Sequence, residues 1–236
     1  MRVIRSLLLA IVVCSCPFLY GTAQERAFSV VLKGNLSTLG HLFLNPYASD
    51  PVARSRSTSF TDVFGYGAEL RYRIPGSMLS VGVSADRIIS SATQDVRVGA
   101  GRTVPEEDGY WLVPVEVTGY FHIPITDGAF GVFMGAGAGM YFGERRYALA
   151  GASAASTASR TGYGIHVLGG VHYRFTEAFS LSAELKFRDA QFEAVNAFAT
   201  PSVRYGTTQV TLPGKPLESR IHSDGMVIQL GAAYSF

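Results

Sequence analysis

The residues of this sequence that could do chemistry are five histidines and a set of charged side chains that alternate with apolar ones. An activated nucleophile needs a serine or cysteine within hydrogen-bond reach of a histidine, for example two residues away on one strand. None of the five histidines is followed by serine at that spacing. His222, Ser223 and Asp224 are consecutive, but neighbouring strand residues point to opposite faces, so they do not predict a catalytic triad.

Metal and phosphate chemistry are not indicated either. His166 and His172 share one face of a predicted strand, but six residues at roughly 3.3 Å each separate them by some 20 Å, too far for one ion. The run of glycines at 135, 137 and 139 lies inside a predicted strand, where a crowded interior explains it better than a phosphate cradle. The sequence therefore predicts no catalytic residue, no metal site and no cofactor.

The charged residues belong to segments in which every second residue is apolar. In residues 64–74, Phe64, Tyr66 and Leu70 fall on one face, and Glu69 and Arg71 fall on the other. Strict alternation over such lengths predicts a β-strand with two unlike faces. Eight segments follow this rule: 28–36, 64–74, 79–86, 111–123, 130–142, 165–175, 181–188 and 226–236.

Composition indicates a membrane protein. Only 16% of the residues are charged and the mean hydropathy is +0.20, which suits a water-facing surface poorly. No run after the first 23 residues approaches the 18 apolar residues of a spanning helix. Because lipid cannot pair with backbone N–H and C=O groups, a closed β-barrel is the remaining solution.

The small and charged residues are expected to face the lumen, and the apolar row is expected to face lipid. Charges inside a narrow barrel must be paired, so we predict a structural network of lumen ion pairs. A proton- or ion-conducting path, or a small-molecule site, is the alternative. The predicted network comprises Glu69, Arg71, Arg73, Glu116, His122, Glu184, Lys186 and Arg188, and Asp86, His166, His172 and Arg174 share its face.

The connections alternate in length, as the two ends of an outer-membrane barrel require. Short connections, expected at the periplasmic rim, lie at 75–76, 124–128 and 176–179. Long loops, expected outside the cell, cover 37–61, 87–110, 143–162 and 189–225. The last loop contains a candidate hairpin whose arms, 202–205 and 208–212, are too short to span a membrane. An all-β, eight-stranded antiparallel up-and-down transmembrane barrel is therefore preferred to one of ten strands.

The first 23 residues have the pattern of a secretory signal peptide. Two arginines precede an apolar stretch from 6 to 20, and small residues lead to a cleavage site after Ala23. Cleavage there leaves the barrel as residues 24–236 and removes both cysteines, so the mature chain has no disulfide. Residues 13–16 also resemble a lipobox, and lipidation at Cys16 is the alternative.

The same cleavage removes Arg2 and Arg5, which lowers the 20 basic residues to 18, equal to the 18 acidic ones. A chain without net charge does not imply a nucleic-acid partner.

The last segment resembles the terminal signal by which bacterial outer-membrane barrels are recognised for assembly. It ends in Phe236, with Tyr234, Leu230 and Ile228 on the same face. Over residues 24–236 the chain resembles the family of small porin-like outer-membrane β-barrel proteins that includes OmpX, Ail and the transmembrane domain of OmpA. The resemblance implies the outer membrane of a Gram-negative-type bacterium, contact with its lipids and lipopolysaccharide, and handling by the barrel assembly machinery.

Two functions remain open for such a protein. The first is a structural or surface-binding role, including adhesion, in which the lumen is filled and a ligand binds loops 37–61, 143–162 and 189–225. The second is a narrow porin-like conduit for small solutes or hydrophobic molecules. A lipid-modifying hydrolase is disfavoured, because the lipid A deacylases among small barrels carry a His-x-Ser pair that this chain lacks.

Overall fold

The computed structural model describes residues 26–236 except 45, 56, 99–101, 125–127 and 224. The predicted signal peptide, residues 1–23, and Cys16 lie outside the described residues and stay predictions. Among the described residues, no helix is long and apolar enough to cross a membrane. The elements are β1 (Phe28–Phe43), α2 (Pro51–Arg54), β2 (Ser57–Arg73), β3 (Leu79–Val98), β4 (Arg102–Ile123), β5 (Phe130–Leu149), β6 (Ala152–Arg160), β7 (Gly162–Arg174), β8 (Phe179–Arg188), β9 (Gln191–Ala197), β10 (Ser202–Tyr205), β11 (Thr208–Thr211), β12 (Leu217–His222) and β13 (Gly225–Ser235).

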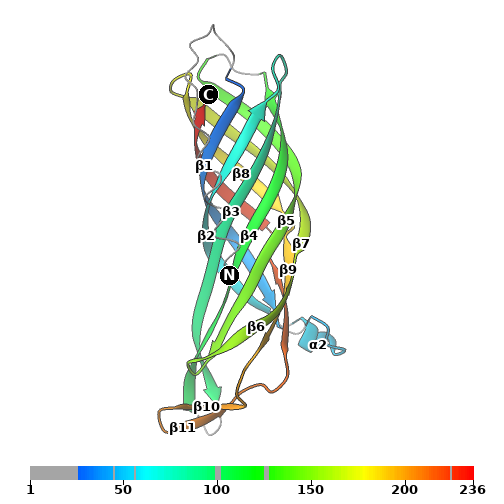
Figure 1. Ribbon diagram of the computed structural model, residues 1–236, viewed down its shortest axis with the longest axis vertical. Coiled ribbons are helices and arrows are strands. Elements are labelled where there is room, and N and C mark those ends of the chain that lie inside the picture. The colour runs from blue at the N-terminus through cyan, green and yellow to red at the C-terminus, as the bar shows by residue number, and fades with distance from the viewer. Residues whose placement is uncertain (1–25, 45, 56, 99–101, 125–127, 224) are drawn as a thin grey trace.

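Eight antiparallel strands close into a barrel, in the order β1-β2-β3-β4-β5-β7-β8-β13 (Figure 1). The ring closes where β13 pairs with β1, with Val30 opposite Tyr234 and Leu36 opposite Ile228. Phe28 and Phe236 exchange backbone hydrogen bonds of 3.2 and 2.8 Å at this seam. The predicted eight-stranded antiparallel barrel is confirmed.

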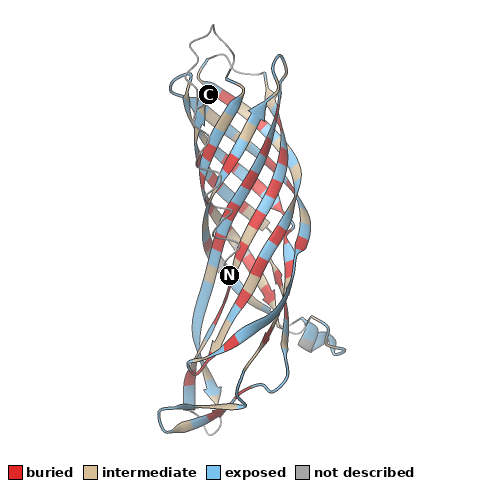
Figure 2. Ribbon diagram, in the orientation of Figure 1, coloured by how far each residue is buried: buried red, intermediate tan, exposed pale blue. Residues whose placement is uncertain are grey.

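The two faces of the wall differ as the alternation predicts. On β2, Phe64 and Leu70 are 69% and 50% exposed on the outside, whereas Glu69 between them is 2% exposed. On β13, Leu230 is 65% exposed and its neighbour Gln229 is buried. Figure 2 shows this alternation of exposed and buried residues around the barrel. Contiguous apolar residues on the outside of a closed barrel are the lipid-facing belt of an outer-membrane protein.

The strands run far beyond the membrane. A spanning strand needs 9–11 residues, but β3 and β5 have 20 and β4 has 22, roughly 70 Å along the strand at 3.3 Å per residue. Outside the belt, β6, β9 and β12 take the places of β7, β8 and β13 in the wall, because β6 pairs with β5 and β12 pairs with β1. The predicted loops are therefore largely strands of an external extension rather than irregular segments.

The outward rows mark where the lipid ends. Along β3 the outward residues change from Val83 and Ile89 to Thr93 and Asp95. Along β5 the apolar row ends at Phe142, and the next outward residue is Glu144. The start of β1 and the end of β13 lie at the opposite rim, which is the periplasmic side by the usual orientation of such barrels.

The external extension has an open seam between β2 and β3. Their pairing stops at Gly65 opposite Ile88, and β3 then continues to Val98 with β4 as its partner. The outer part of β2 keeps β1 as its partner, as the inner part does. At the tip, β10 and β11 form the separate hairpin that the sequence suggested, and Arg102 donates to the hydroxyls of Thr207 and Thr208 at 2.8 and 2.5 Å.

Candidate functional site

The lumen contains two clusters of charged residues, one above the other. In the cluster nearer the periplasm, Glu69 forms an ion pair with Lys33 at 2.5 Å and accepts a hydrogen bond from Arg71 at 2.9 Å. Arg71 also reaches Glu184 on the far wall at 3.3 Å. Strands β1, β2 and β8 thus contribute two cations and two carboxylates, and three of the four side chains are almost fully buried. Such mutual pairing is what makes buried charge tolerable.

The second cluster is centred on Glu116 of β4, whose side chain has no exposed surface. Its carboxylate accepts from Lys186 at 2.7 Å and from the hydroxyl of Tyr141 at 3.2 Å, and Arg188 lies 3.8 Å away. His166 lies 3.9 Å from the same carboxylate, and its Nε2 is 2.9 Å from the hydroxyl of Thr118. One carboxylate on β4 therefore organises side chains from three other strands, β5, β7 and β8.

Glycines on β5 make room for this cluster. A methyl group on Gly137 would collide with the carbonyl oxygen of Val117 and lie 2.7 Å from the ring of His166. A methyl on Gly139 would lie 2.8 Å from Cγ of Glu116. The glycine run that the sequence attributed to a crowded interior thus faces the bulkiest part of the lumen.

Below the charges, towards the periplasm, Tyr120, Phe133 and Leu168 pack together as a buried apolar group. The two rings meet edge to face at 5.9 Å, and the guanidinium of Arg71 lies 3.9 Å from the centre of the Tyr120 ring. A cation above a desolvated aromatic face is favourable. Arg71 thus joins the first charged cluster to this apolar group, and it also lines the periplasmic mouth.

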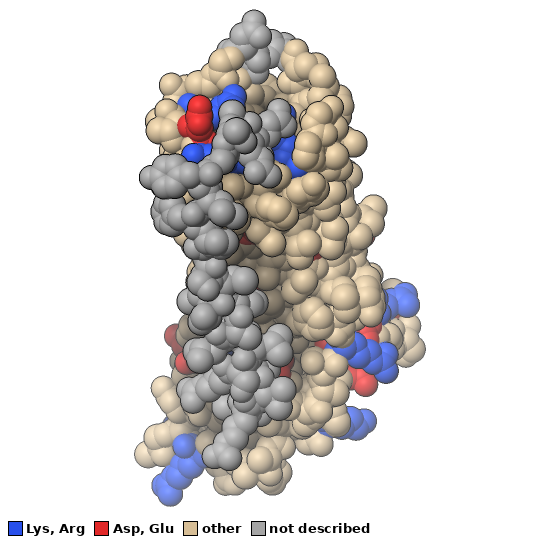
Figure 3. Space-filling model, turned by 45° about the horizontal axis from the view of Figure 1, so that its top comes forward, with Lys and Arg blue, Asp and Glu red and all other residues tan. Residues whose placement is uncertain are grey.

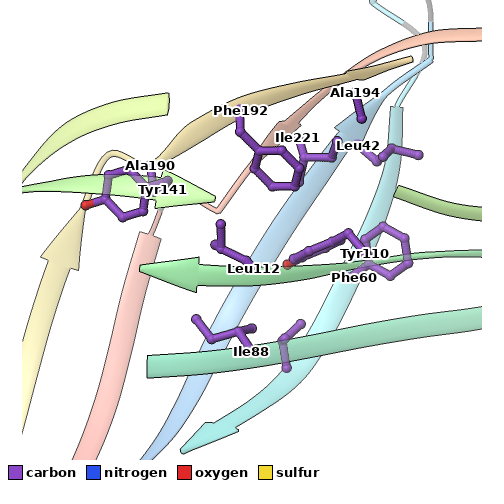
Figure 4. Close-up of a cluster of buried hydrophobic side chains, with 11 residues drawn as sticks. Leu42, Phe60, Ile88, Tyr110, Leu112, Tyr141, Ala190, Phe192, Ala194 and Ile221 are labelled. Carbon is purple, nitrogen blue, oxygen red and sulfur yellow. The ribbon is translucent and has the colours of Figure 1, made fainter. Parts of the chain in front are cut away.

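Above the charges lies a larger apolar layer (Figure 4). Its side chains point into the space that the strands enclose, with Phe60 and Phe192 packed edge to face on Tyr110 at 5.5 and 6.3 Å. Water has few partners in such a layer, which therefore resists hydration. The layer consists of Leu42, Phe60, Val63, Ile88, Tyr110, Leu112, Tyr141, Ala190, Phe192, Ala194 and Ile221.

The periplasmic mouth holds a polar pocket of about 540 Å³. Arg73, Arg174, His122 and His172 line it, and Arg26 lies at its edge. Figure 3 shows basic side chains gathered around this end of the molecule. The ring of His122 is 2.9 Å from the hydroxyl of Ser80.

Outside the membrane, an ion pair network joins the segment after β1 to the wall. Glu193 of β9 accepts from Tyr47 and from Arg220 of β12, whose guanidinium lies 2.9 Å away, and Arg220 also contacts the Tyr47 hydroxyl at 3.2 Å. The hydrogen bond from Tyr47, followed by the contacts with Arg220, lowers the pKa of Glu193 below its ordinary value of 4.5. We call these three residues the external clasp.

The structure groups the predicted network residues into three sets. Glu69, Arg71 and Glu184 form the first charged cluster, and Glu116, Lys186 and Arg188 belong to the second. Arg73 and His122 lie apart from both, at the mouth. The prediction placed all of them in one network, but within the described part of the chain these last two residues form no ion pair with a carboxylate.

Sequence reasoning missed several lumen residues. Lys33 is on the inward parity of its strand and pairs with Glu69, but it was left out of the predicted network. Tyr120, Phe133 and Tyr141 also lie inward, and the signal was available, because each is an aromatic residue on the parity otherwise occupied by small or charged residues. The apolar layer was missed because most of its members fall in segments predicted as loops.

Catalytic and metal chemistry find little support among the described residues, where no group of three histidine, cysteine, aspartate or glutamate side chains could hold a metal ion. The Ser80–His122 contact joins two strands, so no spacing within one strand could have revealed it. Nδ1 of His122 has no hydrogen-bond partner in the described part of the chain. A Ser-His-Asp catalytic triad needs a carboxylate that accepts a hydrogen bond from this ring nitrogen.

The closed wall, the apolar belt and the charged, side-chain-filled lumen define an integral outer-membrane β-barrel protein. No family model matches the chain, and no curated protein matches it. Among solved structures, the fold is similar to that of the outer membrane protein OprG from Pseudomonas aeruginosa, with 14% identity, a TM-score of 0.55, and 90% of this chain and 97% of that chain covered.

Two further structures are similar at lower scores. Neisserial surface protein A has 16% identity and a TM-score of 0.49 over 89% of this chain and 97% of that chain. Ail, the attachment invasion locus protein of Yersinia pestis, has 13% identity and a TM-score of 0.42 over 89% and 99%. The similarity to OprG agrees with the predicted fold class, which the strand order of the closed barrel confirms.

Proposed function

We propose that the protein is a structural, surface-binding barrel that carries a β-extension outside the cell and binds an extended segment of a partner protein there. The observation that carries this proposal is the unpaired outer edge of β3. From Ile89 to Val98 the strand pairs with β4 on one side, and no described strand pairs with its other side.

A free strand edge presents a row of unpaired N–H and C=O groups, and an extended peptide can add to it as a further strand. Native edges are usually blocked by lysine, proline or inward charges. Residues 89–94 of β3 are neutral and include no proline, and residues 91–95 are exposed. From residue 89 to residue 94 the edge therefore lacks the usual protection, and its charged residues, Asp95 and Arg97, lie beyond that stretch.

The partner is not a second copy in the same membrane. Two copies side by side in one membrane are related by an axis along the membrane normal, so their β3 strands run in the same sense. Neighbouring strands of a parallel pair are related by a translation, which produces their evenly spaced, slanted hydrogen bonds. Two strands that are related by a two-fold axis cannot form this pattern. A segment of a different chain has no such restriction.

The filled lumen supports a binding role over the conduit. A buried aromatic group, two charged clusters and an apolar layer follow one another along the barrel axis. A narrow eight-stranded barrel has an interior that side chains can fill. We therefore favour the surface-binding role over transport, and a non-enzymatic role over a hydrolase.

The contacts with the envelope are also proposals. Arg87 and Arg146 are exposed near the outer boundary of the belt, where guanidinium groups can pair with lipopolysaccharide phosphates. Ile228, Leu230 and Tyr234 form the outward row of β13 and end beside Phe236, which suits recognition by the assembly machinery.

The edge is tested with the variant S91K/T93K, which places two lysines on the free strand. Decapeptides selected from a displayed random library against the wild-type protein should bind the variant at least about ten-fold more weakly, because edge lysines oppose strand addition. The control S49K/P213K adds the same charge at exposed positions outside the strands. Failure to select any peptide, or equal binding to both variants, would refute the proposal.

A further inference from the structure

We propose that the periplasmic mouth of the barrel is a binding site for a phosphate ester. The mouth pocket is lined by four arginines and one carboxylate, that of Glu177. Among these arginines, Arg71 is neutralised by Glu69 and Glu184 in the first charged cluster. The other three provide the positive charge of the pocket.

These three arginines have no carboxylate partner among the residues that the structure describes. Arg174 donates to the carbonyl oxygen of Gly128 at 3.0 Å, and Arg26 donates to that of Ser235 at 3.2 Å. Arg73 has no side-chain contact in the described part of the chain. Each guanidinium has five N–H donors, so most of this donor capacity stays unused. Elsewhere in the lumen, buried cations pair with carboxylates. The mouth is an exception because its three arginines lack such a partner.

The chemistry of the lining fits phosphate better than an apolar ligand. Guanidinium groups bind phosphate oxygens in bidentate fashion. Serine hydroxyls surround them and can donate to the remaining oxygens or to a polyol attached to the phosphate. The serines that line the pocket are Ser29, Ser80, Ser180, Ser182 and Ser235.

The pocket has the form of a binding site rather than a channel entrance. Its volume of about 540 Å³ lies in the range of small-molecule sites. Arg71 lines the pocket, and its guanidinium lies 3.9 Å from the centre of the ring of Tyr120, which packs with Phe133 and Leu168. An anion that enters the mouth therefore meets Arg71, which lies against this buried group.

Two sources can supply this ligand, a soluble phosphate ester of the periplasm or the phosphoglycerol headgroup of a lipid in the inner leaflet. The experiment separates them. For the soluble ester, the purified full-length barrel in zwitterionic detergent at low salt is titrated with glycerol phosphate in a calorimeter. For the lipid, the barrel is taken from mixed nanodiscs, and the phosphatidylglycerol molecules that it retains are counted by native mass spectrometry.

The test variant is R73Q/R174Q, and the control is R54Q/R204Q, which removes the same charge from exposed positions outside the membrane. We expect R73Q/R174Q to weaken binding by about ten- to a hundred-fold, as the loss of charge-assisted hydrogen bonds does, and the control to bind as the wild type does. Gel mobility of the unheated protein verifies that each variant is folded.

Binding of glycerol phosphate that depends on Arg73 and Arg174 would identify a soluble ester as the ligand. Retention of phosphatidylglycerol alone, with the same dependence, would identify the lipid headgroup. The proposal is overturned if neither probe binds the wild type, or if R73Q/R174Q and R54Q/R204Q bind equally.

Discussion

At the scale of single residues, Glu116 is the side chain on which the lumen depends most. It pairs with Lys186 and lies near Arg188, and all three side chains are fully buried. We predict that E116A destabilises the folded barrel by about 3–5 kcal/mol, because it leaves buried cations without a carboxylate. Urea unfolding in lipid vesicles measures this change.

Two further variants check the cause. E116L/K186M replaces the pair by apolar side chains and should recover part of the lost stability, since the pair costs desolvation that an apolar pair does not. R160Q removes a cation that is 83% exposed beside Glu193, and it should leave the unfolding midpoint unchanged. A midpoint for E116A equal to that of R160Q would contradict the central role of Glu116.

The external clasp should respond to pH. The pKa of Glu193 is lowered in the folded protein, so its stabilising effect is complete above the ordinary value of 4.5 and is lost as the pH falls through the lowered value. Tyr47 should then separate from Glu193, and the segment after β1 should become more mobile. Amide hydrogen exchange in residues 44–56 measures this, and E193Q should remove the pH dependence.

The sequence predicted which residues face the lumen, but it could not predict how they pair. Alternation alone places Glu69, Arg71 and Glu184 inside. The contact between Arg71 and Glu184 depends on the relative heights of β2 and β8, which lie across the barrel with β1 and β13 between them. Strand stagger is a property of the closed ring and not of any one segment.

At the scale of elements, β5 depends on its inward glycines. We predict that G137A lowers stability by about 1–3 kcal/mol, the usual cost of overpacking, because the added methyl meets the Val117 carbonyl and the His166 ring. G34A is the matched control, since nothing lies within 4 Å of a methyl at that outward position of β1. Equal unfolding midpoints for the two variants would show that the lumen can relax around the methyl.

The sequence predicts the strands that span the membrane but not the strands of the external extension, and the reason is physical. Where one face meets lipid and the other a packed lumen, the sequence must alternate, as in residues 64–74. The outer half of β3 and most of β6 are exposed on both faces, so no period of two remains in Ser90–Asp95 or in residues 155–160. Backbone pairing with neighbouring strands holds these strands in place. The residue pattern within one strand does not indicate that pairing.

At the scale of the whole molecule, the stacked groups in the lumen should stop ion flow. We predict that the protein reconstituted in planar bilayers shows no sustained conductance, because the apolar layer around Tyr110 and the pairs of Glu116 leave no continuous polar path. A large-lumen porin in the same bilayers provides the positive control. Stable conductance steps would instead favour the conduit.

The pairing of β1 with β13 has a consequence for biogenesis. The first strand of the barrel finds its second neighbour about 200 residues later in the chain, and contacts of such separation form late. Until β13 arrives, β1 is an unprotected sheet edge, open to aggregation. We therefore expect the edge of β1 to need shielding until the last strand is in place, and the ring to close only then.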